Sequence, residues 1–157
     1  MNNLFLLLLM IFLHIVDDYY LQGWLASAKL KQYWEDNAPN ELYKDDYKCA
    51  LFMHSFSWSF MIMLPIAFIM TFNINVQFVM IFILNIILHA ITDDLKANKK
   101  EINLIDDQSI HMIQIFLTFL SMTWWFKSYG NKHILKDAIK DKYGQYHDDI
   151  IYEIINN

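Results

Sequence analysis

The chain has 157 residues, of which 56% are hydrophobic and 17% aromatic, and its formal net charge is -5 at pH 7. This length leaves room for one compact bundle. The charge is spread over loops and tail without a basic stripe, which argues against nucleic acid as a partner. Cys49 is the single cysteine, so an intrachain disulfide is excluded.

Long apolar runs predict membrane-spanning helices. Between Cys49 and Thr92 there is no Asp, Glu, Lys or Arg, and this run fits two spans of roughly 20 residues each. Two further apolar stretches bring the number of expected spans to four. Together they predict an all-α, up-down-up-down transmembrane four-helix bundle in residues 1–128. We expect the spans at about 3–22, 47–71, 75–96 and 106–127. The first lacks a basic leader and a small-residue cleavage site, so we expect a span rather than a signal peptide.

Two segments outside the spans are also expected to be helical. Gly23–Trp34 places three aromatic side chains around two lysines, a composition typical of a helix at the lipid headgroup level. Residues 129–157 carry Ile and Leu at helical spacing. They predict an amphipathic helical tail on the membrane surface or against the bundle.

Four polar clusters interrupt the apolar sequence. Three of them place a histidine and an aspartate four residues apart, and the fourth is a lone histidine, His54. On a helix this spacing puts both side chains on one face, one turn apart. Ionisable groups inside spans are costly and indicate function. The three pairs are His14 with Asp18, His89 with Asp93, and Asp107 with His111.

The positions of the clusters predict that they meet. In four antiparallel spans, the end of the first, the start of the second, the end of the third and the start of the fourth lie on one side of the membrane. All four clusters occur at those ends. The loops on that side carry seven lysines between residues 29 and 100, which predicts the cytoplasmic face of a bacterial inner membrane. Five lysines between residues 127 and 142 argue for the opposite orientation.

In each His/Asp pair the aspartate has a second aspartate directly beside it in the sequence. Only one member of each such doublet is aligned with the histidine. At about 100° per residue, the aligned aspartates share a stripe with the histidine of their cluster. The aligned members are Asp18, Asp93 and Asp107. The other members, which we expect to be solvated at the interface, are Asp17, Asp94 and Asp106.

Imidazole and carboxylate groups on facing helices are typical of metal sites. We expect one or two divalent metal ions, with zinc favoured and manganese or iron as alternatives. Seven ligands exceed what one tetrahedral ion needs, so either two ions bind or some carboxylates orient the histidines. Helix-to-helix hydrogen bonds and structural ion pairs are the non-functional alternative. The candidate ligands are His14, Asp18, His54, His89, Asp93, Asp107 and His111.

The combined pattern resembles a known family. It reads His14-x3-Asp18-Tyr19-x2-Gln22, Ala28-Lys29, His54, His89-x3-Asp93-x2-Lys96 and Asp107-Gln108-x2-His111, over residues 10 to 115. This resembles small multi-spanning membrane proteins of bacteria and their phages, a family without an agreed function that usually has Phe in place of Tyr19. It is also loosely similar to membrane-bound metal-dependent hydrolases. The resemblance implies a functional polar site.

These observations favour an integral membrane metal-dependent hydrolase that acts on a lipid or lipid-linked ester or phosphoester at the membrane interface. A bound metal acidifies water and polarises the scissile group, and a free carboxylate serves as general base. Ammonium and amide groups bind an anionic headgroup or orient ligands. The candidate catalytic residues are Asp18, Asp107 and Lys96, and the candidate binding residues are Gln22, Gln108 and Lys29.

Other classes remain as alternatives. An ion-coupled or small-molecule transporter needs a polar path to the far side, for which the spans offer only weak candidates such as Asn85, Thr118 and Ser121. A non-enzymatic phage membrane effector with a membrane protein partner would need the cluster for stability alone, and a di-iron oxidase ranks below both. The tryptophans need no cofactor explanation, because aromatic belts account for most of them. The sequence does not define the oligomeric state.

Overall fold

The computed structural model describes residues 2–143, with side-chain surroundings through Ser128, and this part of the chain is helical without any strand. The part of the predicted amphipathic tail that covers residues 144–157 lies outside the described residues. The long helices are α1 (Asn3–Ile15), α4 (Asp46–Ile69), α5 (Val76–Asp94) and α6 (Leu104–Tyr143). The short ones are η1 (Val16–Leu21), α2 (Leu25–Ala28), α3 (Lys31–Asn37), η2 (Glu41–Tyr43) and η3 (Leu95–Lys99).

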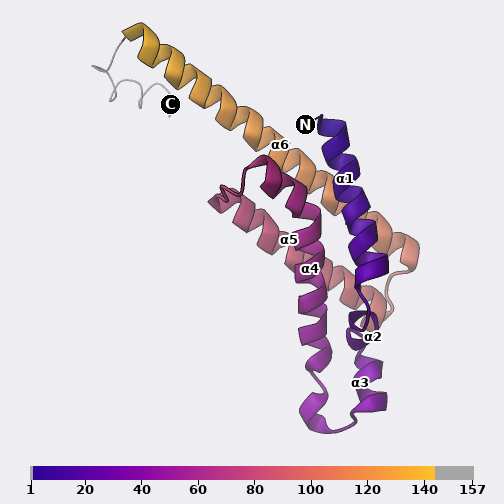
Figure 1. Cartoon of the computed structure of the whole chain (residues 1–157). Helices are drawn as coiled ribbons and strands as arrows, with labels where there is room; N and C mark the ends of the chain where they lie inside the picture. The colour runs from indigo at the N-terminus through magenta and orange to yellow at the C-terminus, as the bar shows by residue number, and fades with distance from the viewer. Residues whose placement is uncertain (1, 144–157) are drawn as a thin grey trace. The chain divides into compact units, whose positions relative to one another are not determined.

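The chain divides into two compact units, Met1–Phe119 and Leu120–Asn157, and the boundary falls inside α6. The first unit contains α1, α4, α5 and the first part of α6 (Figure 1). Within it, α4 packs against both α1 and α5. Every candidate site residue of the sequence lies in this unit.

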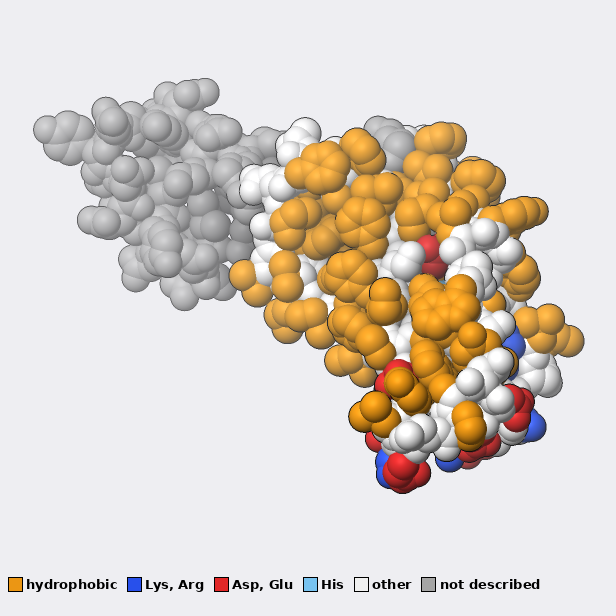
Figure 2. Space-filling view, turned by 60° about the horizontal axis from the view of Figure 1, so that its bottom comes forward, with side chains coloured by type: hydrophobic (Ala, Val, Ile, Leu, Met, Phe, Trp, Pro, Cys, Tyr) orange, Lys and Arg blue, Asp and Glu red, His pale blue; other side chains and the backbone are white. Residues whose placement is uncertain are grey.

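Four helices of the described part are long and apolar enough to cross a membrane, as in an integral membrane protein. They cover Asn3–Leu21, Glu41–Ile69, Val76–Lys99 and Leu104–Ser128, which confirms the predicted all-α class and the four spans. Large apolar side chains such as Phe5, Phe68 and Ile113 are exposed. Figure 2 shows hydrophobic side chains over most of one face of the described residues, with charged side chains gathered at one end.

Asparagines determine where three of the spans begin. The Asn2 side chain accepts a hydrogen bond from the Leu4 N–H, and Asn75 accepts one from the Phe78 N–H. Asn103 likewise accepts from the Ile105 N–H at the start of α6. Each cap satisfies a backbone donor that has no partner within its helix, so the helix starts at a defined residue.

Two spans end in π-helical turns on the side of the polar clusters. α1 passes directly into η1, and α5 passes into η3, after which Lys100 adopts a left-handed backbone with φ of 57°. A π turn widens the helix by one residue and is frequently found at functional sites. Asp18 lies inside the first of these turns, so it is not on the regular helix that the spacing predicts.

The segments outside the spans differ from the prediction in detail. The interfacial helix expected at Gly23–Trp34 is two short helices, α2 and α3, because the chain breaks at Lys29 and the extended Leu30. α6 continues without interruption past residue 128 to Tyr143, so the expected boundary between bundle and tail is not a helix end.

Candidate metal centre

The clusters of four separate helical segments meet inside the first unit. α4 supplies His54, α5 supplies His89 and Asp93, α6 supplies Asp107 and His111, and the π turn after α1 supplies Asp18. All are buried or nearly buried: the side chains of His89, His111 and Asp107 are at most 1% exposed and that of Asp18 is 7% exposed. Six of the seven ligands predicted from the sequence therefore form one continuous cluster.

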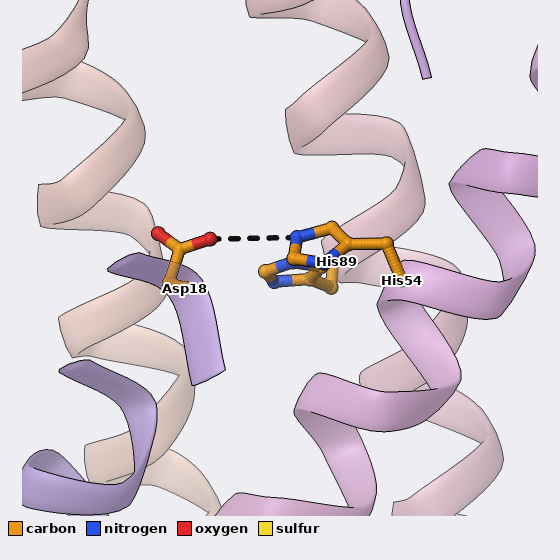
Figure 3. Close-up of side chains that lie close together, drawn as sticks. All are labelled: Asp18, His54 and His89. Carbon is orange, nitrogen blue, oxygen red and sulfur yellow. Dashed lines mark hydrogen bonds and ion pairs between the residues drawn. The ribbon is translucent and has the colours of Figure 1, made fainter. Parts of the chain in front are cut away.

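One half of the cluster surrounds His54. Its Nε2 atom lies 3.1 Å from His89 Nε2 and 3.4 Å from Asp18 Oδ1. It also lies 3.2 Å from Asp93 Oδ2. Figure 3 shows the Asp18 carboxylate pointing toward the His54 ring, with His89 beside it. Ligand atoms of a tetrahedral zinc ion, each about 2.0–2.1 Å from the metal, lie about 3.3 Å from one another. The observed separations match that spacing.

The other half surrounds His111. Its Nε2 atom lies 3.4 Å from both Asp93 Oδ1 and Asp107 Oδ1, and His89 Nε2 lies 3.8 Å from Asp93 Oδ1. The two carboxylate oxygens of Asp93 thus face different histidines. Two triads, one of Asp18, His54 and His89 and one of His89, Asp93 and His111, each bring their ligand atoms within 4.8 Å. The shared His89 makes them neighbouring parts of one centre.

Several buried polar atoms at the centre make no hydrogen bond. Neither ring nitrogen of His111 has a hydrogen-bond partner, and Asp107 Oδ1 has none, although the His111 side chain is fully buried. Buried polar atoms are normally paired, because an unpaired one loses its interaction with water without compensation. A cation bound among these atoms would satisfy them.

Aromatic stacking orients the two central rings. The ring of His89 stacks on both Trp58 and His111, with 4.2 Å between ring centroids in each pair, and the Trp58 and His111 centroids lie 5.4 Å apart. The Nδ1 atoms of His89 and His111 make no hydrogen bond, so packing takes the place of the usual outer hydrogen bond of a metal-binding histidine. Trp58 is not part of an aromatic belt, because its side chain is fully buried against the histidines.

A hydrogen-bond chain runs from Trp58 to two carboxylates. Trp58 Nε1 donates to His14 Nδ1 over 2.7 Å, and because an indole N–H only donates, the proton of the neutral His14 ring is on Nε2. That nitrogen donates to Gln108 Oε1 over 3.1 Å. The Gln108 amide nitrogen then donates to Asp18 Oδ2 and to Asp107 Oδ2, each over 3.0 Å. Both nitrogens of His14 are therefore engaged, and His14 lies outside the two triads.

Two lysines bind the carboxylates from the outside. Lys29 Nζ lies 2.6 Å from Asp93 Oδ2, and Lys96 Nζ lies 2.7 Å from Asp107 Oδ2. Asp18 is bound instead by the Gln22 side-chain amide, which donates to its Oδ1 atom. With neutral imidazoles, the three carboxylates carry one more charge than the two ammonium groups balance. A protonated histidine or a bound cation would neutralise this charge.

The centre opens at a polar pocket. This pocket has a volume of about 430 Å³, and its charged and amide side chains are those of Asp18, Gln22, Lys29, Lys96 and Gln108. All five are residues that the sequence assigns to catalysis or binding. The other pockets of the described residues lie elsewhere, and the largest of them are apolar. The polar pocket is thus the route by which a water-soluble group reaches the centre.

The doublet aspartates that are not aligned with a histidine have three different environments. Asp17 is 1% exposed and accepts a hydrogen bond of 2.6 Å from Ser57 Oγ, so the prediction that it is solvated was wrong. The π turn places it against α4. Asp94 is partly exposed and binds Asn98 and Lys99, whereas Asp106 is exposed, as expected.

A second polar layer lies one helical turn deeper in the bundle. Asn85 precedes His89 by four residues, and Gln114 follows His111 by three. Gln114 Nε2 donates to Asn85 Oδ1 over 2.9 Å, and the Asn85 amide donates to Thr118 Oγ1 over 3.0 Å. Asn85 was only a weak candidate in the sequence, and Gln114 was missed. Its spacing of three residues from His111 was the signal that could have indicated it.

The comparisons with known proteins add no family. No protein-family model matches the chain, and neither the curated proteins nor the solved structures include a significant match. The class is therefore defined by the molecule itself: a helical protein with four candidate membrane spans and buried His/Asp groups that could hold a metal ion.

Proposed function

We propose that this protein is an integral membrane metal-dependent hydrolase, which cleaves an ester or phosphoester of a lipid or lipid-linked substrate at one membrane face. The observation that carries the proposal is the pair of His/Asp triads that share His89 and lie beside a polar pocket. His111 Nε2 and Asp107 Oδ1 make no hydrogen bond and lie 3.4 Å apart, a separation that two ligands of one metal ion would also have.

The arrangement supports two ions better than one. The Asp93 carboxylate directs one oxygen toward His54 and the other toward His111. Each of these histidines also lies near a second carboxylate, Asp18 for His54 and Asp107 for His111. A carboxylate shared between two ions is typical of centres in which the metals lie about 3.5–4 Å apart. Divalent ions held there would polarise an ester or phosphoryl oxygen and acidify a water molecule. Zinc fits the mixed nitrogen and oxygen donor set, and manganese or iron remains an alternative.

The protein's own groups then have separate tasks. Asp18 and Asp107 lie at the two outer ends of the cluster, so either can accept a proton from water as general base when it is not a metal ligand. Gln108 bridges both carboxylates and fixes the distance between them. His14 positions Gln108, and we assign it that role in place of the ligand role expected from its spacing.

The membrane setting supports the substrate class. The pocket opens near the ends of spans, at the level where lipid headgroups lie, and apolar side chains such as Leu30 and Leu104 complete its lining. We place this face toward the cytoplasm of a bacterial cell because of the lysines in the adjoining loops. Membership in the family of small bacterial and phage membrane proteins is part of the same proposal and rests on the sequence pattern.

Elemental analysis of the detergent-purified protein tests the proposal. We expect one or two zinc, manganese or iron ions per chain, and loss of the metal in a His89→Ala, Asp93→Ala double variant. A matched control is the Asp94→Ala, Lys99→Ala double variant, which breaks a partly exposed ion pair at the end of α5 and should keep the metal. A folded parent protein that binds none of these ions would exclude the hydrolase.

A substrate panel tests the reaction. Phospholipids and soluble phosphate and carboxylate esters are incubated with metal-loaded protein in detergent, and hydrolysis is followed by product release. Turnover should require the metal and disappear in the His89→Ala, Asp93→Ala variant. Full metal occupancy without turnover of any ester would leave the metal centre in place and overturn the enzymatic role.

An ion-coupled transporter is a second candidate, because the layer of Asn85, Gln114 and Thr118 extends the polar region one turn below the histidines. Proteoliposomes loaded with a zinc- or pH-sensitive dye distinguish the two functions. Ion entry that depends on the protein and stops in an Asn85→Leu variant would favour the transporter, and hydrolysis without ion entry would favour the enzyme.

A further inference from the structure

Two lysines bind carboxylates that a metal would also use. Lys29 binds Asp93 Oδ2, the oxygen that also faces His54, whereas Lys96 binds Asp107 Oδ2 and leaves Oδ1 toward His111. Their side chains are 12% and 35% exposed, against 3% and 1% for their partners. Each ammonium group therefore lies between the buried centre and the pocket.

The backbone around Lys29 is fixed, so that only its side chain is free to move. Asn98 Nδ2 donates to the Lys29 carbonyl over 3.1 Å, and the Lys31 N–H donates to Asn98 Oδ1 over 2.7 Å. Trp34 Nε1 donates to the Ala28 carbonyl over 2.7 Å. The two Asn98 bonds tie the turn between α2 and α3 to η3, which carries Lys96. Both lysines consequently start from defined positions at the same pocket.

The pocket is lined by hydrogen-bond donors. Besides the two ammonium groups, Gln22 and Gln108 line it with amide N–H groups that are already engaged with the acidic residues, and Asp18 is its one carboxylate. Ammonium groups that converge on one cavity are donors that bind a phosphate-type oxyanion. While both lysines are paired with aspartates, however, their charge is neutralised and the pocket attracts an anion weakly.

We propose that the pocket is an oxyanion subsite, which forms when metal binding displaces Lys29 and Lys96 from Asp93 and Asp107 and which holds the phosphate-type group of the substrate. The inference rests on the proposed metal centre and names the substrate class. A divalent cation that takes Asp93 Oδ2 competes directly with Lys29, and one that binds Asp107 through both carboxylate oxygens competes with Lys96. The released ammonium groups reach the pocket, where they add two positive charges beside the substrate.

The same lysine should have opposite effects on metal affinity and on anion affinity. Replacing a lysine by methionine removes a competitor from a metal-binding carboxylate, so metal affinity should rise. It also removes a donor from the subsite, so anion affinity should fall. Because linkage is reciprocal, metal and anion should each strengthen the binding of the other, by about tenfold for a coupling of ordinary size. Lysines that served only to neutralise buried carboxylates would not produce the second effect.

Isothermal titration calorimetry of the detergent-purified full chain tests this inference, with zinc and inorganic phosphate as the probes. Zinc is titrated first into metal-depleted parent, Lys29→Met and Lys96→Met proteins, and phosphate is then titrated into each zinc-loaded protein. We expect zinc to bind about tenfold more tightly to each variant and phosphate to bind at least about tenfold more weakly. Circular dichroism establishes that each variant is folded.

A matched control is Lys31→Met, which removes an exposed lysine from the neighbouring turn without touching the cluster. Both affinities should equal those of the parent. A Lys29→Arg variant keeps the charge and should retain most of the phosphate affinity. This second variant keeps the inference falsifiable if a methionine variant fails to fold, because loss of phosphate binding in it would contradict a role based on charge.

The outcomes separate the two proposals. If the parent binds no zinc, the proposed metal centre fails. If zinc binds, but phosphate binds equally with and without zinc or equally in the parent and the methionine variants, the metal centre stands and the subsite is overturned. Weaker zinc binding in the methionine variants would likewise overturn the displacement.

The source of the oxyanion is tested with nanodiscs. Zinc-loaded protein is reconstituted in phosphatidylcholine alone or with phosphatidic acid, and phosphate is titrated again. A phosphatidic acid headgroup that fills the subsite should abolish phosphate binding in the parent protein, which supports a lipid ligand. Unchanged phosphate affinity supports a free phosphate compound. Absence of phosphate binding in both nanodisc types contradicts the subsite.

Discussion

Trp58 Nε1 lies 2.7 Å from His14 Nδ1, and both side chains are fully buried between spans that are distant in sequence. Because the indole donates and cannot accept, this contact sets the tautomer of His14 and the direction of every hydrogen bond that follows. The Gln108 amide group is turned so that its nitrogen faces two carboxylates. A tryptophan thus orients the acidic groups of the centre without touching them.

Replacing Trp58 by Phe should remove the hydrogen bond that orients His14 while keeping an aromatic ring over His89. We expect a loss of about 1–2 kcal/mol in the free energy of unfolding, since His14 keeps a buried nitrogen without a donor. Zinc affinity should fall several-fold, because Gln108 is no longer held. Thermal unfolding in detergent and zinc titration measure the two effects. Trp24→Phe is the matched control: it removes an exposed indole hydrogen bond to Tyr33 and should change neither quantity.

Exchanging Gln108 for Glu tests the amide bridge. The substitution removes both N–H donors and places a third carboxylate between Asp18 and Asp107, so we expect a destabilisation of about 3–5 kcal/mol. The melting temperature of the purified protein measures it. Gln32→Glu makes the same chemical change beside Asp36 on an exposed helix and should leave the melting temperature nearly unchanged. Equal effects at the two positions would refute the bridge.

The neighbours Asp17 and Asp18 should respond oppositely to conversion to Asn. Asp17 is buried with one oxygen unpaired, so Asp17→Asn should preserve metal content and stabilise the protein by about 1 kcal/mol. Asp18→Asn removes a charged ligand that faces His54 and should lower metal occupancy. Elemental analysis and thermal unfolding of both variants decide this, and loss of metal in Asp17→Asn would contradict the assignment.

Metal should stabilise the folded chain. An ion that binds only the native state raises the free energy of unfolding by about 2.7 kcal/mol when its free concentration is about 100 times its Kd. Thermal unfolding with and without zinc, and after addition of a chelator, measures the shift. The His89→Ala, Asp93→Ala variant serves as the control and should show no shift, since its ligands are gone. A shift of equal size there would place the metal elsewhere.

The deep polar layer gives a prediction that separates stability from activity. Asn85→Leu leaves Gln114 and Thr118 without their main partner, at a cost of about 1–2 kcal/mol. In a hydrolase, the metal content and the turnover per folded molecule should stay near the parent values. Retained metal with lost ion entry in proteoliposomes would instead identify the layer as part of a transport path.

Local sequence determined the membrane spans and which side chains share a helix face. Apolar runs of the right length predict the four helices, because the hydrocarbon core has a fixed thickness. The spacing of His89 and Asp93 places both on one face, since a helix repeats every 3.6 residues. Topology then brings the cluster ends to one side of the membrane. None of these steps needs more than the order of the residues.

Tertiary structure decided what each polar group contacts. The role of His14 depends on Trp58, which lies 44 residues away, and that of Lys29 depends on Asp93, 64 residues away. Asp17 turns inward because a π turn replaces the regular helix, and helical periodicity cannot predict that change of angle. Hydrogen-bond partners and burial arise from packing between segments distant in sequence, so they are set only when the helices come together.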